Sequence, residues 1–460
     1  MQLHSTFRGA FDVARRLIPR RRPETQVLRG LEGDVEVLTD DWGVPHIYAD
    51  TAHDLFFAQG FVTARDRMFQ MDYNRHGAAG RLCELVGRRE LPWRDLTVHL
   101  KAKTTFDVDV MLRTFGMARS ARDSLPMHSQ ESRDMLTAYA AGVNAYIATG
   151  ARTLEHRILR TDPEPWRELD SLLMLKGIGF ELNFSWRSAL VSALLDQADV
   201  PEDLARVLWP HYRPGGPTIV DPEAWAQVAT DLARTREAAG AALGMGNAPG
   251  VGSNSFVVAA SHSKNGDALA ANDTHLVLMA PQPWHEVRLH GGGFDMRGFA
   301  LTGVPGITIG KTPHHTWGIT AGMVQDLDLF VERLHPDDPK RYLTPDGWQT
   351  LFEREEEIIV RGEKTEKRTI FESRHGPLLE TVATEADAGY RYAVAWTGHR
   401  PGRDLDGLLG VWKAESFAEF RESLRHLVCP TYNITYADRC PTESPDSGTD
   451  PRFRRAAGAA

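Results

Sequence analysis

The feature that most constrains the fold is a change in the pattern of apolar residues near the middle of this 460-residue chain. In the first half, apolar residues recur at helical spacing. From Glu237 to Gly252 the chain is dominated by Ala, Gly and Pro without a periodic apolar face, which is typical of a linker. Beyond it, short apolar runs alternate with turn residues and predict β-strands. Helices followed by strands indicate an α+β fold built from packed layers.

The clearest helix of the first half is amphipathic. Its apolar residues recur at steps of four and three, at Phe57, Phe61, Ala64, Met68 and Met71. This spacing places them on one buried stripe. Thr51, three residues before Asp54, resembles a capping box that starts the helix. Further helices are expected at 138–147 and 169–177.

The second half predicts mainly strands. The predicted strands span 255–260, 268–271, 357–360, 369–371 and 392–397. Gly266-Asp267 reads as the turn between the first two, which would form a hairpin. Helical periodicity returns at 417–427.

Composition bounds the partners and the compartment. The net charge is -9, which gives no reason to expect a nucleic-acid partner. No stretch approaches the ~18 to 20 apolar residues of a membrane helix, so no membrane partner is expected. The basic run Arg15–Arg22 has no apolar segment after it and predicts a solvated tail, not an export signal. The sequence therefore predicts a cytoplasmic protein.

Two other sites are weakly suggested by spacing. Gly244-Met245-Gly246 lacks the third glycine at the required distance and a preceding strand, so a nucleotide loop is not expected. A metallohydrolase would need a ligand set of known geometry. His285 and His290 are five residues apart and His314-His315 are adjacent, and neither pair gives such a set.

The segment with the strongest chemical implication is Gly252-Ser253. A serine inside a chain is a poor nucleophile at neutral pH because its hydroxyl needs a base. As the first residue of a chain it can use its own α-amine, whose pKa is about 7.7 to 8.0. Cleavage of the Gly252–Ser253 bond would create that amine. A glycine before the serine tolerates strained backbone geometry, which suits such a cleavage site.

Several motifs in order around Ser253 resemble the penicillin acylase family of N-terminal-nucleophile hydrolases. They are Gly43-Val44-Pro45-His46-Ile47, the run Gly60–Met71 with Ala79–Leu82, Asn272-Asp273-Thr274-His275, Gly303–Gly306, Thr316–Gly322, Asp326–Phe330 and Thr431–Asp438. The resemblance covers about 34–438. It implies a four-layer αββα fold with two stacked antiparallel sheets between helix layers, and a linear amide as the small-molecule substrate.

The resemblance also implies site residues. Ser253 falls at the nucleophile that self-cleavage releases, and His275 at a position where the family has histidine or glutamine beside it. An imidazole there could hold or polarise the serine hydroxyl. Ala321, with Gly322 as its neighbour and substitute, falls where a backbone N–H contributes to the oxyanion hole. Asn433 falls where a side-chain amide contributes the second donor.

The sequence departs from the family at its calcium site. Many relatives bind a structural calcium through several carboxylates. Asp328 matches one ligand, but Gln325 and Ala189 stand where two acidic ligands are expected. We therefore expect no cofactor, with Asp328 as a weak calcium candidate.

The predicted organisation has five parts. They are an irregular leader at 1–33, a small-subunit-like region at 34–235, a spacer at 236–252, the N-terminal part of a large-subunit-like catalytic region at 253–438, and a tail at 439–460. The Pro-, Ser- and Arg-rich tail predicts disorder and a C-terminally truncated member. If processed, the protein would be a heterodimer of its own two fragments. The alternative is an inactive remnant of the same family.

Overall fold

The computed structural model describes residues 25–90, 104–183, 252–276, 279–322, 324–379, 390–438 and 455–457. Its helices are α2 (Ala52–Ala79), α3 (Leu82–Val86), α4 (Thr105–Phe115), α5 (Met117–Ser124), α6 (Gln130–Ile147), α7 (Leu154–Leu159), α8 (Glu168–Glu181), α13 (Asp404–Lys413) and α14 (Phe417–Ser423). Among these described helices, none is long and apolar enough to cross a membrane. Most of the predicted leader lies outside the described residues, and so does the predicted spacer apart from Gly252.

The structure contains the three helices predicted for the first half of the chain. Thr51 is the N-cap of α2, and its side chain accepts a hydrogen bond from the Asp54 N–H. The predicted apolar stripe of α2 is buried except for the half-buried Phe61. The helices expected at 138–147 and 169–177 correspond to α6 and α8, which start eight residues and one residue earlier.

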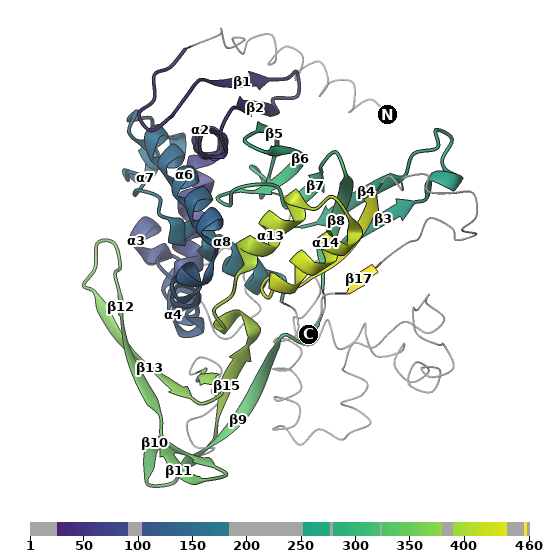
Figure 1. The fold of residues 1–460 in the computed structure, drawn as a ribbon. Helices are drawn as coiled ribbons and strands as arrows, with labels where there is room; N and C mark the ends of the chain where they lie inside the picture. The colour runs from purple at the N-terminus through teal and green to yellow at the C-terminus, as the bar shows by residue number, and fades with distance from the viewer. Residues whose placement is uncertain are drawn as a thin grey trace, which may run out of the picture.

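An eight-stranded sheet forms the centre of the molecule (Figure 1). Its order is β1 (Val35–Thr39), β2 (Pro45–Ala49), β5 (Trp284–Gly291), β6 (Phe294–Leu301), β7 (Ile309–Lys311), β8 (His315–Ala321), β16 (Tyr432–Asp438) and β17 (Arg455–Ala457). The β2–β5 pair is parallel, and it joins a strand of the first half to a strand of the second. The other neighbours are antiparallel.

Further strands lie beside this sheet. They are β9 (Leu327–His335), β10 (Asp338–Thr344), β11 (Gly347–Thr350), β12 (Phe352–Ile358), β13 (Glu366–Ser373), β14 (Gly376–Pro377) and β15 (Tyr390–Trp396). They form a four-stranded and a three-stranded sheet. The hairpin predicted at 357–371 is confirmed as β12–β13, and the strand predicted at 392–397 as β15.

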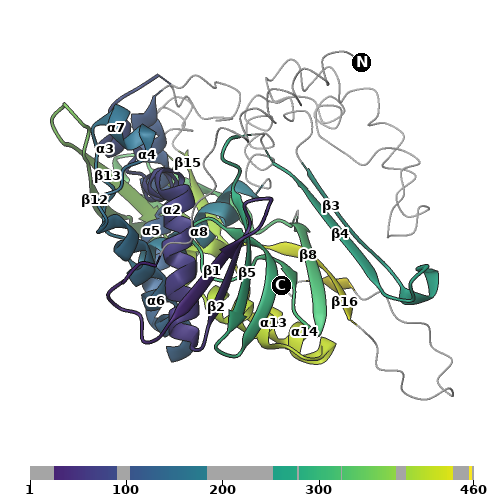
Figure 2. The same cartoon turned by 90° about the horizontal axis from the view of Figure 1, so that it is seen from above.

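The two faces of the central sheet have different neighbours. Trp317 and Ile319 of β8 are buried on one face, where His315 of the same strand packs edge-on against Phe420 of α14 at 5.1 Å. The hairpin of β3 (Gly252–Val258) and β4 (Leu269–His275) lies against the other face, beside β8 and β16 (Figure 2). The described residues therefore form helix, sheet and hairpin layers. This architecture is α+β, and the fourth layer of the expected sandwich stays a prediction.

Close packing of α2 on α6 gives a test of this core. A methyl group added at Gly60 would collide with the Tyr139 carbonyl oxygen of α6, whereas one at Gly77 of the same helix meets nothing within 4 Å. We expect Gly60→Ala to lower the free energy of unfolding by about 1–3 kcal/mol because overpacking forces the helices apart. Gly77→Ala should raise it by about 0.5–1 kcal/mol because alanine favours the helix. Urea unfolding of both variants checks this. Equal effects would contradict the packing.

Candidate active site

Ser253 is the second residue of β3 and lies on the side of the hairpin that faces the central sheet. Side chains of a strand alternate between faces, so Ser253 shares a face with Ser255. The Ser255 Oγ hydrogen-bonds Thr435 Oγ1 of β16 at 2.6 Å, which fixes that face toward the sheet. The Ser253 hydroxyl donates to the Gly252 carbonyl oxygen at 2.6 Å. The hydroxyl thus lies against the peptide bond that the sequence marks for cleavage.

The hairpin is attached to the sheet by polar contacts. Trp284 Nε1 of β5 donates to Thr274 Oγ1 at 2.9 Å, and Thr274 is the register partner of Ser253. The Asn272 side-chain amide makes two hydrogen bonds to the backbone of Ile319 in β8, each 2.9 Å long. Together with the Ser255–Thr435 contact, these bonds hold the hairpin layer at a fixed height over the sheet.

Asn433 and Ala321 lie at the end of the β8–β16 ladder. Asn433 shares its face of β16 with Thr435, so its side chain faces the hairpin layer. Its Nδ2 donates to the Ala321 carbonyl oxygen at 3.0 Å. This bond fixes the Asn433 amide over the end of the β8–β16 ladder.

The backbone N–H of Ala321 is set by the same ladder. The N–H of Gly322 donates across to the Thr431 carbonyl oxygen at 3.1 Å. Successive N–H groups along a strand alternate in direction. The Ala321 N–H therefore points to the opposite side of β8, away from β16.

His275 ends β4 on the other face of the hairpin. It is the register partner of Gly252, and its Nε2 lies 2.9 Å from Asp273 Oδ2 and 3.4 Å from Asn254 Nδ2. The three side chains occupy the face directed away from the sheet, opposite to Ser253. The described contacts thus pair the imidazole with Asp273, and its predicted action on the serine hydroxyl stays a prediction.

The structure brings together part of the predicted set and adds to it. Ser253 and Asn433 lie on facing surfaces, with Ala321 at the end of the neighbouring strand. Asn272 and Asp273 belong to a motif that the sequence singled out for His275 alone. The signal in the sequence was an asparagine and an aspartate close to a candidate histidine. Asp273 pairs with that histidine on the same strand, whereas the partners of Asn272 depend on how the two layers stack.

The residues around Asp328 do not fit calcium. Calcium takes six to eight oxygen ligands. The Asp328 side chain is exposed on β9, where its Oδ1 accepts from the N–H of Leu329. Gln325 is exposed and neutral, and Ala189 lies outside the described residues. We derive no step from a metal at this position.

Two groups of possible metal ligands occur among the described residues, and neither includes Asp328. In the group His76, Glu84 and Glu164, both carboxylates already pair with Arg81, at 2.6 and 2.8 Å. The hydrogen bonds that Arg81 donates to these carboxylates raise its pKa, although burial opposes this. The other group is Glu32, His53 and Asp54, in which both Asp54 oxygens accept backbone N–H groups. Both groups are satisfied as structural contacts.

Comparison with known proteins identifies relatives. The penicillin amidase family model matches residues 34–442. Acyl-homoserine lactone acylase QuiP from Pseudomonas aeruginosa is 28% identical over 430 residues, covering 90% of this chain and 49% of that protein. Penicillin acylase 2 proenzyme from Pseudomonas sp. strain SE83 is 31% identical over 365 residues, covering 76% and 44%. The chain thus spans about half the length of these curated relatives.

Among solved structures, the tetragonal form of thermostable penicillin G acylase from Alcaligenes faecalis is similar. It is 25% identical, with a TM-score of 0.33, over 43% of this chain and 98% of that chain.

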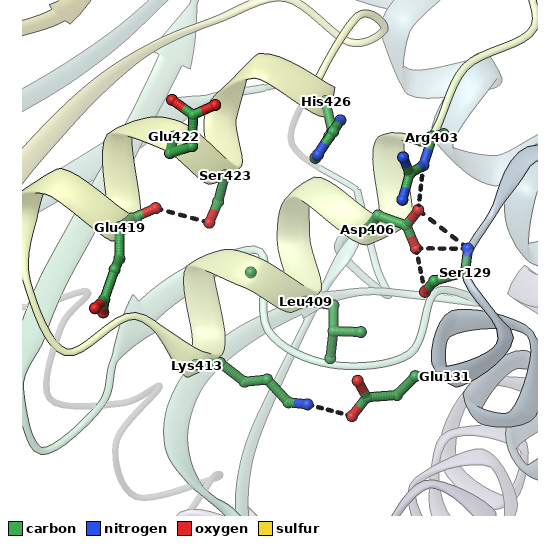
Figure 3. A pocket seen from close by; sticks show the side chains of 11 residues that line it. Ser129, Glu131, Arg403, Asp406, Leu409, Lys413, Glu419, Glu422, Ser423 and His426 are labelled. Atoms are coloured by element: carbon green, nitrogen blue, oxygen red, sulfur yellow. Dashed lines mark hydrogen bonds and ion pairs between the residues drawn. The ribbon is translucent and has the colours of Figure 1, made fainter.

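A separate hollow of about 430 Å³ lies between α13, α14 and the start of α6, on the helix side of the sheet (Figure 3). Four of its charged side chains form two ion pairs: Lys413 contacts Glu131, and Arg403 contacts Asp406 at 2.7 Å. Asp406 also accepts from the Ser129 N–H and from the Ser132 hydroxyl. Burial by itself raises the pKa of Asp406, but the hydrogen bonds from the two serines and Arg403 outweigh it and lower the pKa to about 2.

This carboxylate predicts a pH dependence of stability. The folded-state pKa of Asp406 lies below the ordinary value of 3.8. Its contribution is therefore present above about pH 4 and lost as the pH falls from about 4 to 2. We expect Asp406→Asn to lower the free energy of unfolding at pH 7 by about 1–3 kcal/mol. The difference from the parent should shrink toward pH 2.

Urea unfolding across this pH range measures the difference. The surface variant Asp123→Asn on α5 serves as the control. A parent–variant difference that does not change with pH would contradict the role of the Asp406 charge.

Proposed function

We propose the function of this chain from one premise: it belongs to the penicillin amidase family. In our proposal the chain cleaves itself between Gly252 and Ser253, and the freed Ser253 hydrolyses a linear amide through an acyl-enzyme. The observation that carries the proposal is the placement of Ser253 on a hairpin that faces Asn433 and Thr435 of β16. With a nucleophile on one layer and hydrogen-bond donors on the other, a substrate carbonyl can bind between them.

Self-cleavage starts at a hydroxyl already in contact with its target. The Ser253 Oγ is 2.6 Å from the Gly252 carbonyl oxygen. Attack of Oγ on the Gly252 carbonyl carbon forms an ester as the bond to the Ser253 nitrogen breaks. Water then hydrolyses the ester, giving a Gly252 carboxylate and a Ser253 with a free α-amine. The product is a heterodimer of the two fragments.

Substrate hydrolysis uses the new α-amine as the base for the Ser253 hydroxyl. In the proposed cycle Oγ attacks the amide carbonyl, and the oxyanion accepts hydrogen bonds from the Ala321 N–H and from the Asn433 side-chain amide. Collapse expels the amine product and leaves an acyl-Ser253 ester. Water releases the carboxylic acid. His275 lies on the opposite face of the hairpin and pairs with Asp273, so the proposed cycle passes no proton through it.

The names of two relatives support a proposal for the class of substrate. One is an acyl-homoserine lactone acylase and another a penicillin acylase 2 proenzyme. We propose a small-molecule amide with an apolar or aliphatic acyl group, of the β-lactam side-chain or N-acyl-homoserine lactone type. Fold alone does not choose between them.

Self-cleavage is tested by intact mass spectrometry of the full chain. We expect two fragments that meet at Gly252–Ser253, and a single uncut species for Ser253→Ala because no hydroxyl can attack. Ser255→Ala, on the same strand and face, is the matched control and should still be cut. An uncut parent would contradict the proposal and favour the inactive alternative.

The oxyanion role of Asn433 is tested by turnover of the processed protein. The probes are p-nitroanilides of phenylacetic, hexanoic and dodecanoic acids. On whichever is hydrolysed, Asn433→Ala should lower kcat about 100- to 1000-fold with little change in KM, because the donor acts mainly in the transition state. Asn265→Ala, in the turn of the β3–β4 hairpin, is the control. Unchanged kcat in Asn433→Ala would remove this residue from the mechanism.

A further inference from the structure

Strand β8 loses its neighbour on one side before it reaches Ala321. The register of β7 with β8 ends at Trp317. On the other side of β8, the Gly322 N–H donates toward β16. Because the N–H and C=O groups of successive strand residues alternate in direction, those of Ile319 point away from β16. They project into the space beyond the end of β7, where the described chain gives β8 no strand partner.

The side chain of Asn272 fills this position. Its Nδ2 donates to the Ile319 carbonyl oxygen at 2.9 Å, and its Oδ1 accepts from the Ile319 N–H at 2.9 Å. The same Nδ2 donates to the Asn254 carbonyl oxygen at 3.0 Å. These three bonds use both hydrogens and the carbonyl oxygen of the amide. The Asn272 amide therefore makes the two hydrogen bonds to β8 that the backbone of a neighbouring strand would make.

We propose that Asn272 is a positioning residue that sets the separation between the nucleophile and the oxyanion donor. This inference rests on the proposed function. On the hairpin, Asn272 is the register partner of Ser255, two residues from Ser253. On β8, its partner Ile319 lies two residues before Ala321. One side chain thus fixes a point close to each reacting group, on the two layers that meet at the site.

The other contacts between the layers act differently. The Thr274–Trp284 bond reaches β5, and the Ser255–Thr435 bond reaches β16. Neither holds the open edge of β8 from which the Ala321 N–H projects. Loss of the Thr274 bond would loosen the hairpin but leave the edge of β8 in place. Loss of the Asn272 bonds would free the hairpin and the edge of β8 together. A misplacement of about 1 Å at a reacting centre can cost about 100-fold in rate.

The test compares Asn272→Asp with Thr274→Val. Aspartate has the shape of asparagine, but it cannot donate to the Ile319 or Asn254 carbonyl oxygens. Each full-length chain is made by pulse-labelled cell-free synthesis, and the rate constant of Gly252–Ser253 cleavage is measured. The intermediate of this cleavage carries an oxyanion that the same Ala321 N–H would stabilise. We therefore expect Asn272→Asp to lower the rate constant about 100-fold, and Thr274→Val to keep it within about threefold.

The rate constant separates positioning from folding. A variant that folds poorly loses amplitude of cleavage, whereas a folded variant with displaced groups loses rate. Near-UV circular dichroism and the thermal midpoint record the fold of each variant. If Asn272→Asp does not fold, Asn272→Ser is the second variant. Serine keeps one hydrogen-bond donor, so its rate constant should be lower than the parent's, but by less than the roughly 100-fold expected for aspartate.

Each outcome bears on a different claim. Cleavage of Asn272→Asp at the parent rate, or equal slowing by Thr274→Val, would overturn the positioning role while the parent still cleaves itself. An uncut parent would overturn the proposed function, and the role of Asn272 with it.

Discussion

The parallel pairing of β2 with β5 is the constraint on which the rest of the structure depends. It makes one sheet from strands on either side of the proposed cleavage point. The cores of the two halves are also shared: Phe56 of α2 packs edge-on against Phe294 of β6 at 5.3 Å. The buried Gln59 amide bonds both the N–H and the carbonyl oxygen of Gly306, at 2.8 and 3.0 Å. Each such bond contributes about 0.5–1.5 kcal/mol. Together with the shared core and sheet, these bonds would keep the fragments joined after a cut at Gly252–Ser253.

This shared sheet also explains where the site lies. The central sheet is covered by helices on one face, and its other face receives the β3–β4 hairpin. The site forms where the hairpin starts, over the end of the β8–β16 ladder. Side-chain hydroxyls, the Asn272 amide and the Trp284 indole make the hydrogen bonds between these two layers. Hydrogen bonds are directional, so they fix the orientation of the hairpin on the sheet more closely than apolar packing would.

Local features of the fold could be predicted from sequence because their causes are local. The Thr51 cap, the stripe of α2 and the β3–β4 hairpin follow from capping, periodicity and turn residues. The resemblance supplied Ser253, Ala321 and Asn433. The role of Asn272 could not be predicted, because it depends on β7 ending before Ile319. The face occupied by His275 follows from the strand register, which the sequence pattern did not specify.

The most direct test of the central claim is acylation of Ser253 itself. The processed protein would be mixed with p-nitrophenyl phenylacetate, quenched in acid within the pre-steady state and digested with pepsin at low pH, where the protonated α-amine cannot take the acyl group from the ester. The account predicts an added phenylacetyl mass on the peptide that begins at Ser253, removed by hydroxylamine because it is an ester. No adduct on that peptide, or a hydroxylamine-resistant adduct confined to amines, would contradict the account.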